Sequence, residues 1–201
     1  MSTAGRKDSF YFRAKSLEYR SRAAFKLLEL QERFGVIGNG PVLEFGSSPG
    51  GWTQAALSFT VGPILSIDRV SMEPVENVTF LKADLLDPSV EVKIRDWLSA
   101  NNLGGFSSVL SDAMVKTSGN HSLDHSRSYE ICRRVLDLSL MFLTEGGSVA
   151  AKMFQGDLTA ELFREYSGFF DFRKITSVSA TREGSSEIYL VFKRFSGKRV
   201  R

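Results

Sequence analysis

One short segment carries most of what this chain reveals: Val42-Leu43-Glu44-Phe45-Gly46-Ser47-Ser48-Pro49-Gly50-Gly51-Trp52-Thr53-Gln54. It begins with an apolar run typical of a buried strand, passes through a glycine-rich turn and ends with residues that suit the start of a helix. Strand, turn and helix in this order form the nucleotide-type cofactor pocket at the carboxyl end of a parallel sheet. The glycines would allow positive φ angles and a close approach of the ligand, because they carry no Cβ atom.

The spacing of these glycines argues against a dinucleotide cofactor. They follow G-x-x-x-G-G, whereas a diphosphate at a helix N-terminus is typically held by G-x-G-x-x-G. The loop therefore favours a cofactor without a diphosphate, such as S-adenosylmethionine.

Length and composition indicate one globular domain. The chain has 201 residues, of which 42% are hydrophobic and 24% charged, enough for a substantial core. It has neither an apolar run that could span a membrane nor the apolar stretch of a secretory signal, so we expect a cytoplasmic protein. We also expect a monomer. The single cysteine, Cys132, excludes an internal disulfide and is expected to be a buried structural thiol.

Charge is distributed unevenly along the chain. Residues 1–26 hold seven Lys or Arg against two acids, a net charge of +5, and residues 193–201 add five basic residues and no acid. The remaining residues carry a net charge of −7. Basic ends with nearby aromatics suit an RNA backbone and its bases, although solvated tails without a partner would show the same pattern.

Apolar periodicity predicts strands that alternate with helices. The strands are expected at 41–45, 63–68, 78–82, 107–112, 147–154, 171–178 and 186–194, and the helices at 21–34, 51–59, 88–101, 125–144 and 158–169. Too few residues separate the last two strands for a crossover helix, so the last strand should run antiparallel to its predecessor. We predict an α/β, Rossmann-like methyltransferase fold: a seven-stranded, mostly parallel sheet with an antiparallel last strand and helices on both faces.

Charged residues mark the carboxyl ends of the predicted strands. Asp68, Asp84 and Asp112 follow three strands, where carboxylates could accept hydrogen bonds from ribose hydroxyls and an adenine amino group. Lys152 interrupts a strand that should be buried on both faces, and a lysine there needs a partner or a role.

Several segments together resemble the RrmJ/FtsJ family of S-adenosylmethionine-dependent RNA ribose 2′-O-methyltransferases, in a form that looks archaeal. The resemblance covers about residues 18–193 and rests on five motifs in the family's order: Ser21–Leu27, Gly46–Gln54, Ser111-Asp112, Lys152–Gly156 and Ser185–Tyr189. Two segments differ from the bacterial pattern: Glu44 replaces an Asp, and Ala113-Met114-Val115-Lys116 replaces Met-Ala-Pro-Asn.

The resemblance implies the functional residues. The catalytic Lys-Asp-Lys-Glu tetrad would fall on Lys26, Asp112, Lys152 and Glu187. Cofactor contacts would fall on Glu44, Gly46, Ser48, Pro49, Gly51, Trp52, Asp68, Asp84 and Asp112. Among the basic residues, we expect RNA contacts from Arg20, Arg22, Lys193 and Arg194.

Methyl transfer from a sulfonium has a neutral leaving group, so the chemical difficulty lies in the poor nucleophile. We expect Lys152 to activate the ribose hydroxyl, either as a base or as a protonated orienting group. Asp112 would orient Lys152, and Lys26 with Glu187 would position the ribose.

Other candidate sites have plainer interpretations. His121 and His125 are expected in a solvated loop at a helix start, with Asp124 as the helix N-cap, and we expect no metal. Trp97 is expected in a helix core, and Trp52 in the wall of the cofactor pocket.

The sequence thus predicts a basic N-terminal extension (1–20), a methyltransferase domain (21–194) and a basic C-terminal tail (195–201). Its substrate is expected to be RNA, a uridine of 23S ribosomal RNA in the large ribosomal subunit. The alternatives are the tRNA anticodon loop or an mRNA cap as target, an NAD-dependent oxidoreductase, and a non-catalytic RNA-binding module.

Overall fold

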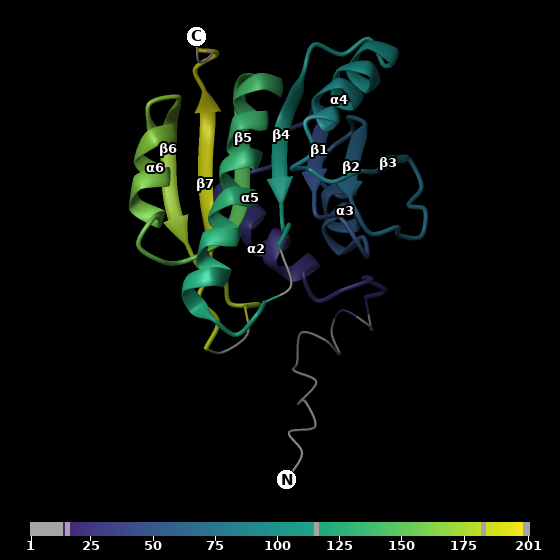
Figure 1. Cartoon of the computed structure of the whole chain (residues 1–201). Coiled ribbons are helices and arrows are strands. Elements are labelled where there is room, and N and C mark those ends of the chain that lie inside the picture. The colour runs from purple at the N-terminus through teal and green to yellow at the C-terminus, as the bar shows by residue number, and fades with distance from the viewer. Residues whose placement is uncertain (1–13, 15–16, 115–116, 182–183, 199–201) are drawn as a thin grey trace.

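The computed structural model of the chain describes residue 14 and residues 17–114, 117–181 and 184–198. These form one seven-stranded sheet with helices on both faces (Figure 1). Much of the predicted basic extension, including Arg6, Lys7, Arg13 and Lys15, lies outside the described residues. So do Arg182 and Glu183 of the predicted turn and the last three residues of the tail.

The sheet has the predicted direction of strands. It contains β1 (Val42–Phe45), β2 (Ile64–Asp68), β3 (Val78–Lys82), β4 (Phe106–Ser111), β5 (Leu143–Phe154), β6 (Phe170–Thr176) and β7 (Glu187–Phe195). Their order is β3-β2-β1-β4-β5-β7-β6, and the pairs from β3 to β5 are parallel. The last strand, β7, is antiparallel to both neighbours and lies between β5 and β6, an insertion that we did not predict.

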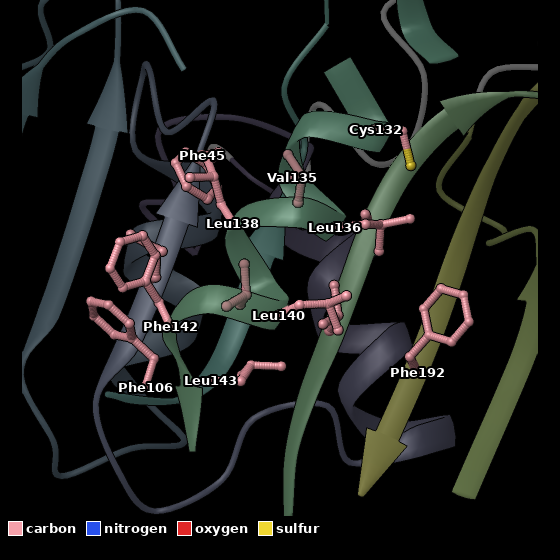
Figure 2. Packing of buried hydrophobic residues seen from close by; sticks show 14 of the residues in the cluster. Phe45, Phe106, Cys132, Val135, Leu136, Leu138, Leu140, Phe142, Leu143 and Phe192 are labelled. Atoms are coloured by element: carbon pink, nitrogen blue, oxygen red, sulfur yellow. The ribbon is translucent and has the colours of Figure 1, made fainter. Parts of the chain in front are cut away.

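Two apolar clusters attach the helices to the sheet. One face is covered by α2 (Ala24–Phe34) and α3 (Gly51–Leu57), and the other by α4 (Ser89–Ala100), α5 (His121–Phe142) and α6 (Thr159–Ser167). In Figure 2, side chains of α5 such as Val135 and Leu138 lie against the sheet beside Phe45. Cys132 is buried in this cluster, as predicted, and burial raises the pKa of its thiol to about 12.

The start of α5 differs from the prediction. The helix begins at His121, and the side chain of Asn120 accepts the N–H of Leu123 at 3.2 Å, so Asn120 is the N-cap. The prediction of Asp124 as N-cap was wrong: Asp124 lies in the first turn, and its carboxylate accepts the N–H groups of Ser118 and Gly119.

The end of α5 also differs, because β5 begins at Leu143, four residues before the predicted start at 147. The other elements lie within a few residues of their predicted bounds. Among the helices of the described ranges, none has both the length and the apolar character needed to cross a membrane.

Candidate active site

The alternation of side chains along two strands brings the predicted catalytic residues to one face of the sheet. On β5, Val149 and Ala151 belong to the α5 cluster, while Ala150 belongs to the α2 cluster. Since successive side chains of a strand point to opposite faces, Lys152 lies on the same face as α2. The register pairs Lys152 with Tyr189 and Phe154 with Glu187, so the ends of the two strands meet beside α2.

Lys26 reaches this place from α2. The helix ends at Phe34, and the next residue, Gly35, has a φ of 59°, the left-handed conformation that glycine adopts readily. Lys26 follows Phe25 on the buried stripe of the helix and is only 8% exposed. Its ammonium donates a hydrogen bond to Oε1 of Glu187, which is also buried, and forms an ion pair with it.

Two contacts of Lys152 are with one residue, Asp112, which directly follows β4. Its Nζ lies 2.6 Å from the main-chain oxygen of Asp112 and 2.9 Å from the carboxylate Oδ1 of the same residue. The lysine is 4% exposed, which confirms the burial expected from its apolar strand.

Tyr189 links the two ion pairs, and we did not predict it from the sequence. Its hydroxyl lies 2.6 Å from Oε1 of Glu187 and 3.0 Å from Oδ1 of Asp112. The ring stacks on Trp52, with ring centroids 5.9 Å apart. The available signal was its place two residues after Glu187, because residues i and i+2 of a strand share a face.

The charges of the cluster determine its protonation. Burial alone would raise the pKa of Asp112, but the ammonium groups of Lys152 and Lys26 outweigh it and hold that pKa below its usual value. Burial raises the pKa of Tyr189 well above its ordinary value, and the negative charges of Asp112 and Glu187 add to the rise. Asp112 is therefore an anion and Tyr189 a neutral donor at physiological pH.

A cavity of about 300 Å³ opens beside this cluster, at the carboxyl ends of the parallel strands. Lys152 lines it, as do apolar side chains such as Ile67 and Ile131. Five of the predicted cofactor residues also line it: Gly46, Ser48, Asp68, Asp84 and Asp112.

The side-chain carboxylate of Asp68 holds the loop around this residue. Asp68 accepts the N–H of Ser48 at 2.9 Å and that of Val70 at 2.8 Å, one on each oxygen. Each oxygen keeps one lone pair for a ligand, since a carboxylate oxygen can accept two hydrogen bonds.

Two glycines of the turn are required by contacts within the chain. Gly46 has a φ of 75°, and a Cβ atom there would lie 2.4 Å from Cα of Ala113, so the turn packs directly on the backbone after β4. A Cβ atom on Gly51 would lie 2.1 Å from Oγ of Ser21. Gly51 thus gives room to the chain itself, and its contact with the cofactor stays a prediction.

Three more predicted cofactor residues lie away from the lining of this cavity. Trp52 is buried between α2 and Tyr189, and its indole N–H donates to the carbonyl of Ala23 at 2.8 Å. Pro49 borders a neighbouring groove with Arg20. Glu44, the third, is 1% exposed, and its Oε2 accepts the hydroxyls of Thr53 and Ser66, each at 2.6 Å.

Two of the three predicted RNA-binding arginines, Arg20 and Arg22, bind the protein's own main chain. Arg20 donates to the carbonyls of Glu73 at 2.5 Å and Pro74 at 2.7 Å, which ties the segment after β2 to the segment before α2. Arg22 donates to the carbonyl of Ala180 at 2.6 Å.

Lys193 and Arg194 lie at the other end of β7. Lys193 is six residues, about 20 Å of strand, from Glu187, and donates to the carbonyl of Phe34. Arg194 is exposed and lies 3.7 Å from Asp171. We therefore leave both residues out of the candidate site.

His125 is buried, contrary to the solvated loop that we predicted. Its Nδ1 lies 2.9 Å from the carbonyl of Phe154, and its Nε2 accepts the N–H of Leu158 at 3.2 Å. His125 thus fixes the loop that follows Lys152, while His121 is exposed.

The sequence of this chain is similar to those of known methyltransferases. The family model of FtsJ-like methyltransferases matches residues 19–195. The chain is 45% identical over 188 residues to the ribosomal RNA large subunit methyltransferase E of Picrophilus torridus, over 93% of this chain and 97% of that protein. It is 41% identical to the protein of the same name from Thermoplasma acidophilum, over 96% and 94% of the two chains.

A solved structure is similar as well. The crystal structure described as that of a ribosomal RNA methyltransferase from Plasmodium falciparum has a TM-score of 0.78 and 31% sequence identity. The match covers 90% of this chain and all of the other.

Proposed function

Because this chain belongs to the family of FtsJ-like methyltransferases, we propose that it transfers a methyl group from S-adenosylmethionine to a ribose 2′-hydroxyl of RNA, at a uridine of 23S ribosomal RNA. The observation that carries the proposal is the buried Lys152–Asp112 pair beside the cavity at the carboxyl end of the sheet. The names of the relatives from Picrophilus and Thermoplasma, ribosomal RNA large subunit methyltransferase E, support ribosomal RNA as the substrate.

The cavity fits S-adenosylmethionine better than a dinucleotide. Three carboxylates line it, from Asp68, Asp84 and Asp112, and they suit the ribose hydroxyls, the ammonium and the sulfonium of that cofactor. The same charges would repel a diphosphate, which weighs against the NAD-dependent alternative. Asp68 and Asp84 would hold the adenosine, with Ile67, Leu85 and Ile131 as apolar surface for the base.

The protein's own residues would supply the activation of the nucleophile. S-adenosylmethionine, when bound, provides a methyl group on a neutral leaving group, so departure needs no acid. Lys152 then acts in one of two ways: its neutral amine accepts the proton of the 2′-hydroxyl as the new oxygen–carbon bond forms, or its ammonium orients the hydroxyl. Asp112 fixes the direction of the Lys152 amine, and the Lys26–Glu187 pair, joined to it through Tyr189, positions the ribose.

The proposal is tested by methyl transfer from labelled S-adenosylmethionine to three substrates: large ribosomal subunits, free unmodified ribosomal RNA and tRNA. We expect transfer to large subunits or their RNA, with the label on a ribose oxygen when the modified nucleotide is mapped. Methylation confined to tRNA would show that the proposed substrate is wrong but would leave the proposed reaction unchanged. Label on a base would reject the proposed reaction. A monomeric state and a cytoplasmic location stay predictions.

A further inference from the structure

The amine of Lys152 has a third neighbour that plays no part in the proposed reaction. Besides the two oxygens of Asp112, at 2.6 and 2.9 Å, its Nζ lies 3.4 Å from Sδ of Met114. An ammonium carries three N–H donors, so these three contacts account for all of them. Two of the acceptors are oxygens of one residue, and the third is a thioether, which is a weak acceptor.

Of the three hydrogen-bonding directions of the Lys152 amine, only the one toward Met114 is open to a hydroxyl of the substrate. The two contacts with Asp112 fix two directions of the amine, and Lys152 is almost fully buried. When the amine is neutral, it keeps two N–H groups for Asp112, and its lone pair then points in the third direction. The ribose hydroxyl must therefore lie in this third direction in both cases. It lies there whether it donates its proton to a neutral Lys152 or accepts a hydrogen bond from a protonated one.

Met114 can leave this place without movement of the main chain. The preceding residue, Ala113, is packed on Gly46, which anchors the backbone. The side chain of Met114 lines the cavity and is 40% exposed. Methionine is unbranched and has flexible torsions, so it adapts to new surroundings at small cost.

We infer that Met114 is a positioning residue whose sulfur occupies, in the RNA-free protein, the place on the Lys152 amine that the ribose 2′-hydroxyl takes during the reaction. This inference rests on the proposed function, because the hydroxyl belongs to the RNA. The thioether yields to the hydroxyl since an oxygen is the better partner for an amine. After displacement, the Met114 side chain forms an apolar wall of the cavity beside the target ribose.

Two nearly isosteric substitutions test the inference. Met114→Leu removes the acceptor, whereas Met114→Gln places a strong amide acceptor on the Lys152 amine. Steady-state methyl transfer to unmodified large-subunit ribosomal RNA is measured with each variant, together with the affinity for S-adenosylmethionine. We expect the KM for RNA to be about tenfold higher in Met114→Gln than in Met114→Leu, because a hydrogen bond to a charged group is worth roughly 1.5–3 kcal/mol. The kcat at saturating RNA should differ much less.

Met141 provides the matched control. It lies at the end of α5 and is 36% exposed, outside the cavity, so Met141→Leu and Met141→Gln should have the same KM. Equal KM values for the two Met114 variants in an active enzyme would overturn the inference alone. A wild-type protein that transfers no methyl group to any RNA would overturn the proposed function, and the inference with it.

NMR with methyl-labelled methionine tests the displacement directly. The signal of Met114 is identified by its loss in Met114→Leu, and it should shift when large-subunit ribosomal RNA is added to the wild-type protein. The signal of Met141 should not shift. A Met114 signal that stays unchanged at saturating RNA would also reject the displacement.

Discussion

The hydroxyl of Tyr189 lies 3.0 Å from Oδ1 of Asp112, the same oxygen that is 2.9 Å from the amine of Lys152. The hydroxyl also contacts Glu187, which is paired with Lys26. One buried phenol therefore connects the two lysine–carboxylate pairs of the site. Its raised pKa, caused first by burial, keeps it protonated, so it can serve as a donor across the working pH range.

We expect Tyr189→Phe to lower kcat about tenfold while the affinity for S-adenosylmethionine stays the same. The ring and its stacking on Trp52 are kept, and only the hydroxyl is lost, whose single proton is shared between the carboxylates of Asp112 and Glu187. We expect this loss to be roughly 1.4 kcal/mol if it is felt fully in the transition state. Single-turnover methyl transfer measures this loss. Tyr166→Phe is the matched control, because Tyr166 is a buried tyrosine of α6 whose hydroxyl binds Asp137 on the opposite face of the sheet. Equal losses in the two variants would assign the effect to stability.

Removal of the central amine should have a larger effect. We expect Lys152→Ala to lower methyl transfer by about 10²–10⁴-fold, the usual contribution of an acid–base group, with little change in the affinity for S-adenosylmethionine. Transfer assays and calorimetric titration check the two quantities separately. Lys93→Ala, on the exposed side of α4, serves as control. Activity near the wild-type level in Lys152→Ala would refute the role of this residue.

A site residue could be predicted from the sequence only where its chemical character conflicts with the pattern of the residues around it. Lys152 was predictable because a charge within a strand buried on both faces conflicts with the apolar pattern around it. Tyr189 was not predicted, because a tyrosine in the apolar run Ile188–Phe192 also suits a core position, and its place two residues after Glu187 shows only that the two side chains share a face. One partner, Asp112, directly follows β4, and the other, Glu187, lies two residues earlier on β7. The insertion of β7 beside β5 is what brings Tyr189 to Asp112.

The position of a residue in a motif also did not determine which way its side chain points. Glu44, at the third position of β1, points between the strands and α3, toward Thr53, and not into the cavity. Gly51 and Trp52 face Ser21 and Ala23 near the start of α2, since α2 packs on α3. Contacts between segments about 30 residues apart cannot be derived from local spacing.

Asp68 should govern cofactor affinity more than turnover. We expect Asp68→Ala to raise the Kd for S-adenosylmethionine about 10–100-fold, because it removes ligand acceptors and releases the N–H groups of Ser48 and Val70. The kcat at saturating cofactor should change little, since Asp68 is not in contact with Lys152 in the described structure. Isothermal titration measures the Kd, with Asp96→Ala on α4 as control. An unchanged Kd would place the adenosine elsewhere.

Glu44 should make the stability of the protein depend on pH. Burial raises its pKa to about 7 from the ordinary 4.5, against the hydrogen bonds from Ser66 and Thr53, which lower it. The folded protein therefore binds the proton more tightly than the unfolded chain. The stability that this group contributes is complete below about pH 4.5 and is lost as the pH rises to about 7.

We accordingly expect Glu44→Gln, which keeps the shape and does not titrate, to be more stable than the wild type at pH 8 by up to about 3 kcal/mol. The amide oxygen can accept the hydroxyls of Thr53 and Ser66, and the amide nitrogen would replace Oε1, which has no hydrogen-bond partner in the described part of the chain. At pH 4.5 the two proteins should be nearly equal, because the wild-type carboxyl is then protonated and neutral as well. Urea unfolding at several pH values gives the difference, and Glu76→Gln, at an exposed position, should show no such pH dependence. A difference between Glu44→Gln and the wild type that is constant from pH 4.5 to 8 would show that Glu44 is ionised inside the fold and that its charge is balanced there.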